Sequence, residues 1–308
     1  MGRSRANGRV EDFLQGLPVP AEAYLRMLAA AAEDVADTVT RRGAPDPFEL
    51  RDPHYIERTL PAVRLASKLY FRADVRGLDH IPPEGPVLIV GNHSGGTVIV
   101  DTYVFAQAFY DHFGPDRRFY QLAHDLVFKL PGLRILVERY GTVPASPENM
   151  GRALRRKAAL LVYPGGDQET YRPSWESDRI DFAGRTGFVE LALKHNVPIV
   201  PVVAIGGQET GLFLGRGRRL AEALQLDRLM RLKVFPPVLG PPFGATLLDL
   251  PIRFPLPAKI SLRVLRPIDL RDRLGRNPGA DEAYKLVTST MQRTLTRLGN
   301  ERTLPVVG

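Results

Sequence analysis

A histidine and three glycines follow one short apolar segment of the chain. Residues 87–90 (VLIV) predict a buried strand, and residues 91–96 (GNHSGG) come directly after it. Ligands of open α/β sheets bind beyond the carboxyl ends of strands, and glycines let a substrate approach the backbone closely. An imidazole placed there can accept a hydroxyl proton near neutral pH. We therefore predict that His93 is a general base; the alternative is a histidine satisfied by hydrogen bonds of its own loop.

Asp101 is the natural partner to fix the tautomer of His93. It follows eight positions later, and eight residues of a continuous helix span about 12 Å, which is too far for a hydrogen bond. The contact therefore requires residues 94–98 to form a loop. Ser94 or a carboxylate from elsewhere in the chain is the alternative partner.

A second apolar segment, residues 158–163 (AALLVY), also ends in glycines, and Glu169 follows shortly after them. Two such strand-end loops can converge on one pocket. Consecutive glycines can direct backbone N–H groups at an oxyanion or a phosphate, although the glycine pair alone also fits a tight turn. The candidates for substrate binding and oxyanion stabilisation are Asn92, Ser94, Gly95, Gly96, Pro164, Gly165, Gly166 and Glu169.

Short apolar strands that alternate with helical segments must position these loops. Strands are predicted at 71–75, 87–91, 119–123, 142–144, 159–163, 199–204 and 260–265, and helices at 21–40, 55–70, 102–113, 148–157, 188–195, 221–231 and 281–298. The proline-rich segment 235–257 predicts a long ordered loop. The alternation favours an α/β domain with a mostly parallel central sheet flanked by helices. We place an N-terminal tail and helices in residues 1–60 and the main domain in residues 61–308.

Composition excludes several kinds of site. The 308 residues include no cysteine, which rules out disulfides, thiolate nucleophiles and cysteine-type zinc sites. No His/Asp/Glu cluster has metal-ligand spacing, so we expect neither a metal nor a cofactor. The chain lacks both the roughly 18–20 apolar residues of a spanning helix and the apolar core of a secretory signal. We therefore expect a cytoplasmic protein that associates peripherally with the inner face of the membrane.

The two loops, in this order, resemble the glycerolipid acyltransferase family, which includes lysophosphatidate acyltransferases and the second type of diacylglycerol acyltransferase. The family carries Asn-His-x4-Asp; Asn92-His93 matches it, whereas Asp101 lies eight rather than five positions after the histidine. Residues 163–169 (YPGGDQE) and 184–202 (GRTGFVELALKHNVPIVPV) are similar to the diacylglycerol and monoacylglycerol branch. The likeness covers about residues 75 to 205.

This resemblance implies a glycerol-3-phosphate acyltransferase-like fold and an O-acyltransferase. Such an enzyme transfers a fatty acyl group from a thioester of coenzyme A or of acyl carrier protein, acting as co-substrate, to a lipid hydroxyl. His93 is then the base, Asp101 orients it, Glu169 is the site carboxylate, and His195 is structural. The family's second motif has an arginine for the acceptor's phosphate, where this chain has Ser146-Pro147. Arg139 and Arg152 are the nearest arginines that could take its place. The absence of the arginine at the expected position favours a neutral alcohol, such as diacylglycerol, as the acceptor.

Charge predicts an anionic partner. The formal net charge is +8, and residues 211–237 mix leucines with basic residues that include Arg216, Arg218 and Arg219, which favours an anionic membrane surface. A solvated helix face is the alternative.

Four other functions are weighed. A lipid-binding protein of the same fold without the chemistry and a lysophosphatidate-type acyltransferase stay open. A serine esterase lacks its Gly-x-Ser-x-Gly elbow, and no nucleic-acid-binding signature is present, so we expect no nucleic-acid partner.

Overall fold

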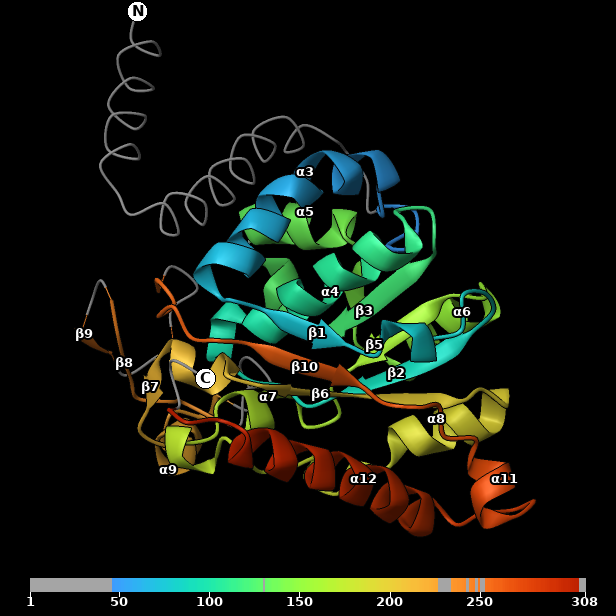
Figure 1. Cartoon of the computed structure of the whole chain (residues 1–308). Coiled ribbons are helices and arrows are strands. Elements are labelled where there is room, and N and C mark those ends of the chain that lie inside the picture. The colour runs from blue at the N-terminus through green and yellow to red at the C-terminus, as the bar shows by residue number, and fades with distance from the viewer. Residues whose placement is uncertain are drawn as a thin grey trace, which may run out of the picture.

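The fold is described from a computed structural model, which describes residues 46–129, 131–226, 234–241, 244–246, 249 and 253–304. The helix predicted at 21–40 lies outside the described residues. Most elements of the central sheet and its helices have the type predicted for them (Figure 1).

Seven strands form the central sheet in the order β1-β10-β6-β2-β5-β3-β4. They are β1 (Asp74–Arg76), β2 (Val87–Gly91), β3 (Phe119–Ala123), β4 (Thr142–Pro144), β5 (Ala159–Val162), β6 (Ile199–Ile205) and β10 (Ser261–Val264). The run β6-β2-β5-β3-β4 is parallel throughout. β10 pairs antiparallel with β6 and parallel with β1. The predicted mostly parallel central sheet is confirmed.

Helices cover both faces of this sheet. They are α3 (Pro53–Leu65), its π-helical continuation η1 (Ala66–Tyr70), α4 (Val100–Phe113), α5 (Pro131–Arg139), α6 (Pro147–Arg155), α7 (Gly166–Thr170), α8 (Gly187–His195), α9 (Arg218–Ala223), α11 (Leu270–Leu274) and α12 (Ala280–Asn300). Figure 1 shows α3, α4 and α5 on one side of the sheet and α8 and α12 on the other.

β2 illustrates why the sheet needs two covering layers. Val87 and Ile89 pack into the core beneath α3 and α4, whereas Leu88 and Val90 pack into the core shared with α6, α8 and α12. Side chains alternate between the faces of a strand, so a strand covered on both faces is apolar throughout. Burying one such side chain contributes about 1.5–3 kcal/mol. This packing fixes the carboxyl ends of β2 and β5 side by side.

Three predicted elements differ from the structure by more than two residues at an end or in their type. The strand predicted at 71–75 starts later, at Asp74, because the helix continues as a π-turn in which Phe71 N–H donates to the Ala66 carbonyl at 3.2 Å. α9 begins at Arg218 rather than at residue 221, and residues 227–231 lie outside the described part. The proline-rich segment contains β8 (Val238–Gly240) and β9 (Gly244–Thr246), which form a small antiparallel sheet with β7 (Leu212–Phe213).

The boundary placed after residue 60 lies within α3. Phe48, Tyr55 and Ile56 are buried, and Phe48 packs with the core of the main domain. Residues from 46 onward are therefore built into the same core as the sheet.

Candidate active site

His93 and Asp101 contact each other across a tight loop between β2 and α4. Gly95, Gly96 and Ile99 adopt left-handed backbone conformations with φ of 91°, 64° and 38°, so the chain turns back on itself before α4 begins at Val100. This brings His93 Nδ1 to 3.2 Å from Asp101 Oδ2. The eight-residue spacing is therefore compatible with the contact, because the intervening segment turns back on itself and contains only the single 3-10 turn η3 (Gly96–Val98), not a continuous α-helix.

Asp101 is a buried acceptor that organises the whole loop. Oδ2 also accepts the Ser94 N–H at 2.8 Å, and Oδ1 accepts the Thr102 N–H at 2.8 Å. Its side chain is 1% exposed. When the Nδ1–H group of His93 donates a hydrogen bond to this carboxylate, the other ring nitrogen, Nε2, is unprotonated and can accept a proton.

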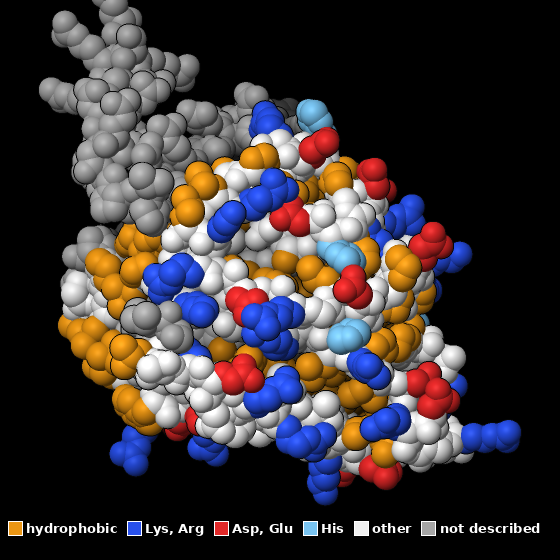
Figure 2. All heavy atoms as spheres, viewed as in Figure 1, with side chains coloured by type: hydrophobic (Ala, Val, Ile, Leu, Met, Phe, Trp, Pro, Cys, Tyr) orange, Lys and Arg blue, Asp and Glu red, His pale blue; other side chains and the backbone are white. Residues whose placement is uncertain are grey.

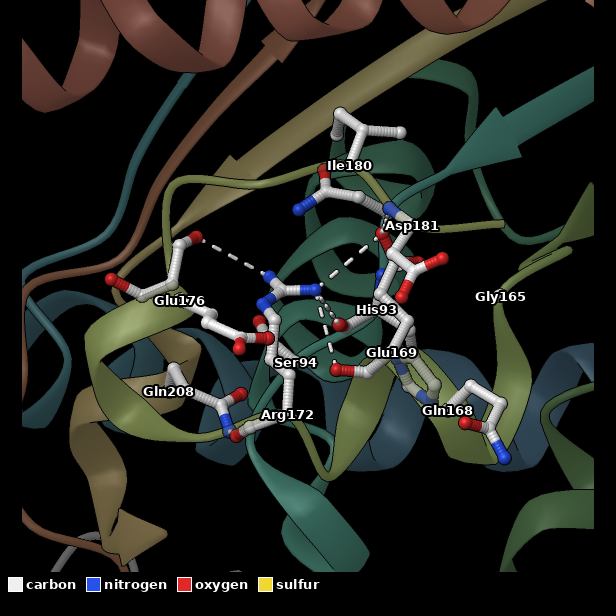
Figure 3. A network of polar contacts seen from close by, with 12 residues as sticks. His93, Ser94, Gly165, Gln168, Glu169, Arg172, Glu176, Ile180, Asp181 and Gln208 are labelled. Atoms are coloured by element: carbon white, nitrogen blue, oxygen red, sulfur yellow. Dashed lines mark hydrogen bonds and ion pairs between the residues drawn. The ribbon is translucent and has the colours of Figure 1, made fainter. Parts of the chain in front are cut away.

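Glu169 and Arg172 form a second buried layer beneath His93 (Figure 3). Glu169 accepts the His93 N–H at 2.9 Å and the Asp181 N–H at 3.2 Å, and Arg172 donates to the His93 carbonyl at 3.1 Å. Arg172 Nη1 lies 3.4 Å from Glu169 Oε1, and both side chains are almost wholly buried. Burial raises the pKa of Glu169 to about 7, against the lowering effect of Arg172 and of its N–H donors. The pair therefore holds the two peptide groups that flank the His93 Cα.

A further pair of charged residues holds this loop. It comes from the proline-rich segment, about 150 residues after His93 in the chain. Asp249 accepts the Thr97 N–H at 2.6 Å, and Arg253 donates to the Gly95 carbonyl at 3.1 Å. Arg253 Nε also donates to Asp249 at 2.7 Å. A Cβ atom at Gly96 would lie 2.0 Å from Asp249 Oδ2, so this close approach requires glycine.

Four of the predicted substrate-binding residues are bonded to other parts of the protein. Asn92 is wholly buried and exchanges two 2.8 Å hydrogen bonds with the backbone of Ala204, tying the end of β2 to β6. Ser94 and Gly95 are buried and bonded to Asp101 and Gln208. Glu169 lies beneath the loop. The polar groups of these four residues bind the protein and none of the four lines the cavity, so a contact of these residues with substrate stays a prediction.

The diglycine turn meets His93 at the same edge of the sheet. Tyr163, at the end of β5, stacks on the His93 ring with a centroid distance of 4.2 Å and an interplanar angle of 15°. Burial, and secondarily Asp101, raises the pKa of Tyr163 well above its ordinary value. Gly165 packs tightly, since a Cβ there would lie 2.5 Å from Glu169 Cβ. The Gly166 N–H donates to the Tyr163 carbonyl at 3.1 Å and closes the turn.

The loop amides leave one candidate oxyanion donor. The N–H groups of four loop residues donate to buried side chains: His93, Ser94, Gly95 and Thr97. The Gly96 N–H has no hydrogen-bond partner among the described residues, and Gly96 lines the cavity.

A cavity of about 1500 Å³ opens beside His93. His93, Gly96, Pro164 and Gly166 line it, so the two predicted loops share one cavity. Its wall on α3, α4 and α5 is largely apolar and includes Val63, Ala106, Leu133, Leu136 and Val137. Ligand pockets for small molecules usually measure about 300–1000 Å³; this one has room for a larger apolar ligand.

The predicted phosphate ligands lie elsewhere. Arg139 stacks on the Tyr55 ring at 4.7 Å. Arg152 donates to Asp46 at 2.6 Å and lies over Phe48. Neither lines the cavity, so a phosphate contact of either arginine stays a prediction. Each arginine is held by an N-terminal residue whose position only the tertiary fold fixes.

Sequence reasoning missed Arg172, Asp249, Arg253 and the stacking role of Tyr163. Arg172 stands three residues after Glu169, a helical spacing that could have indicated the pair. No local signal connects Asp249 and Arg253 with the histidine loop. Among the described residues, no group of three or more His, Asp or Glu side chains is arranged to hold a metal ion.

A paired imidazole at a strand end, beside a large apolar cavity, suits an enzyme that acts on lipids. A family model described as Acyltransferase matches residues 72–205. An uncharacterized protein of Mycobacterium tuberculosis is 30% identical over 280 residues, which span 89% of this chain and 74% of that protein. The chain belongs to this acyltransferase family, and it is an acyltransferase.

Further relatives match about half of the chain. The human DGAT1/2-independent enzyme synthesizing storage lipids is 33% identical over 147 residues, 48% of this chain and 44% of that enzyme. Chloroplastic phytyl ester synthase 2 of Arabidopsis thaliana is 31% identical over 180 residues, 55% of this chain and 25% of that enzyme. The fold is similar to the crystal structure of the 1-acyl-sn-glycerophosphate (LPA) acyltransferase PlsC of Thermotoga maritima, with a TM-score of 0.57 over 93% of this chain and 97% of that one at 16% identity.

The described helices were also compared with the requirements for spanning a bilayer. None of them combines the length and the apolar character that crossing a membrane requires.

Proposed function

We propose that this acyltransferase moves a fatty acyl group from an acyl thioester to the hydroxyl of a lipid alcohol, with His93 as the general base. The observation that carries the proposal is the buried Asp101 carboxylate bonded to His93 Nδ1, on an imidazole that lines the apolar cavity. The hypothesis of a lipid-binding protein without chemistry was motivated by the displaced aspartate. The contact removes that motivation.

The proposed reaction is direct transfer. His93 Nε2 takes the proton of the acceptor hydroxyl while its oxygen attacks the thioester carbonyl. The carbonyl oxygen becomes an oxyanion, which the Gly96 N–H is placed to stabilise. The C–S bond then breaks, and the imidazolium returns the proton to the leaving thiolate. The products are an ester and a free thiol, and no metal or cofactor takes part.

A neutral alcohol is the acceptor that we favour. The cavity wall on α3, α4 and α5 has no Lys or Arg among its described lining residues, and Arg139 and Arg152 are bound elsewhere. Arg185, one of the cations lining the opposite end, is paired with Asp167 at 3.2 Å. Two relatives are named for storage lipids and for phytyl esters, which supports an acceptor without a phosphate.

The decisive experiment supplies labelled acyl-coenzyme A or acyl carrier protein with a panel of acceptors. The panel holds diacylglycerol, monoacylglycerol, fatty alcohols and lysophosphatidate, and products are identified by mass. We expect ester formation with the neutral alcohols, lost in His93→Ala but kept in His54→Ala, which removes an exposed histidine of α3. A parent protein without turnover on any pair, or a His93→Ala variant with full turnover, would overturn the proposal. A preference for lysophosphatidate would overturn only the acceptor assignment.

We also propose that the enzyme works at the inner face of an anionic membrane. The net charge of +8 supports this location. Arg216 cannot serve as the headgroup contact that its sequence suggested, because it is bonded to Glu176 at 2.9 Å and to the Gln168 carbonyl at 3.0 Å. Arg218 and Arg219 are exposed.

A further inference from the structure

The exposed large apolar side chains are concentrated on one side of the molecule. Eight such side chains occur in the described part of the chain, and seven of them lie on η1 and the end of α3, on the turn Ser174–Glu176, and on β7 and α9 with the residues next to them. The seven are Leu65, Leu69, Trp175, Leu212, Leu214, Leu220 and Leu224. We call them the apolar rim. Figure 2 shows hydrophobic side chains gathered on the side where Figure 1 places β7, β8 and β9.

Local geometry holds these side chains outward. Leu212 and Leu214 are each 44% exposed while Phe213 between them is 0% exposed, because alternate residues of a strand point to opposite sides. Leu220 and Leu224 are four residues apart on one side of α9, with Ala221 buried. The Ser174 hydroxyl accepts the Phe213 N–H at 2.9 Å, which links the turn Ser174–Glu176 to β7. Trp175, the next residue of this turn, is 66% exposed.

The rim adjoins the cavity that contains His93. Ala62 and Val63 of α3 line the cavity. Leu65, the last residue of α3, and Leu69, on η1, come next among the exposed leucines. After α9, Leu226 lines the cavity, two residues beyond Leu224. Both groups of exposed leucines therefore continue walls of the same cavity outward.

Cations accompany the rim on both sides. Lys68 and Arg72 are exposed around Leu69, and Arg218 and Arg219 are exposed immediately before Leu220. One exposed acid, Glu222, lies on α9. Basic residues beside exposed leucines and a tryptophan match the interface of an anionic bilayer, where aromatic rings lie at headgroup depth.

We infer that the apolar rim is the membrane-docking surface of this enzyme and that it places the opening of the cavity against an anionic bilayer. The inference deepens the proposed function and rests on it, because a lipid acceptor is what the cavity would take from that surface. Leu212, Leu214 and Trp175 enter the acyl-chain boundary, and Lys68 and Arg219 meet the headgroups.

The chain contains one tryptophan, so its fluorescence reports on the rim alone. The full-length protein is mixed with vesicles of phosphatidylcholine or of equimolar phosphatidylcholine and phosphatidylglycerol. We expect a blue shift of the emission and protection from acrylamide with the anionic vesicles. Leu212→Ser/Leu214→Ser should weaken vesicle binding at least about tenfold, and Lys68→Ser/Arg219→Ser should weaken binding to the anionic vesicles about as much. Arg273→Ser/Arg276→Ser is the charge-matched control at the far end of the molecule, where Figure 1 places α11, and should bind like the parent.

Vesicle binding without a change in tryptophan emission would overturn the inference, since another part of the chain would then be the anchor. So would unchanged binding of the leucine variant, or tryptophan burial that depends on protein concentration without lipid, which indicates a second copy on the rim. Transfer between detergent-dispersed substrates is measured in parallel and should keep the parent rate in Leu212→Ser/Leu214→Ser, which also shows that the variant is folded. If the parent protein shows no transfer but binds vesicles with the expected change in tryptophan emission, the proposed function is overturned and the docking surface is retained.

Discussion

The loop that carries His93 and the wall of the cavity beside it are built on opposite principles. Buried charges hold the loop: Asp101 beside the ring, the Glu169–Arg172 pair beneath it, and the Asp249–Arg253 pair across it. The wall on α3, α4 and α5 is largely apolar and presents no Lys or Arg among its described lining residues. Charged hydrogen bonds are directional and fix an atom in place, whereas apolar contacts are non-directional and scale with area. Separate regions of the molecule thus hold His93 in place and line the apolar cavity.

The largest effect should come from the carboxylate nearest to the base. Asp101→Asn keeps the size of the side chain but removes the charge that favours a proton on His93 Nδ1, so we expect kcat to fall on the order of 10³-fold with little change in KM. The measurement is steady-state transfer with a saturating thioester donor. A rise in KM with unchanged kcat would mean that Asp101 acts in substrate binding and not in positioning the base.

A buried pair should matter far more to stability than an exposed one. Arg172→Met leaves Glu169 without its partner, and we expect the free energy of unfolding to fall by about 3–5 kcal/mol. Arg185→Met is the matched control; its pair with Asp167 is partly exposed and should contribute no more than about 1 kcal/mol. Urea unfolding of both variants tests this contrast, and equal losses would contradict it.

The apolar wall should set chain-length preference. Ala106 is buried on α4 and lines the cavity, so Ala106→Phe should shorten the space for an acyl or acceptor chain. Because each excluded methylene costs about 0.8 kcal/mol, we expect kcat/KM for long chains to drop at least about tenfold relative to short ones. Competition between donors of different length measures the ratio. An equal loss for all lengths would mean that the loop, and not the wall, was disturbed.

The smallest effect concerns pH. The folded state raises the pKa of Glu169 to about 7 from an ordinary value of 4.5, so between these values the folded protein holds a proton that the unfolded chain has released. Stability should therefore be greatest at the acid end of this window and should fall as pH rises through it, by at most ~1.4 kcal/mol per pH unit. Chemical unfolding at several pH values checks the slope. Glu169→Gln should flatten it, and a slope that survives the substitution would belong to other groups.

Several features could be predicted from local sequence alone. The run 87–91 is apolar throughout and forms β2 at those bounds, and the glycines after β2 and β5 mark the two strand ends that meet at the cavity. The roles of Asn92 and Glu169 could not be predicted in this way, because a polar residue beside a catalytic loop has the same sequence whether it contacts substrate or supports the backbone. Their buried partners, Ala204 and Arg172, are brought to them only by the fold.

The sequence by itself determined the sheet class, the family and the identity of the candidate base, since periodicity, strand-end glycines and motif order are local properties of the chain. Only the tertiary structure decided that Asp101 contacts His93, that Asp249 and Arg253 hold the loop from about 150 residues away, and that Arg139 and Arg152 are bound outside the cavity. These contacts depend on backbone turns and on packing between distant segments. A hydrogen bond requires two atoms to meet within about 3 Å, and no pattern along the chain specifies such a meeting.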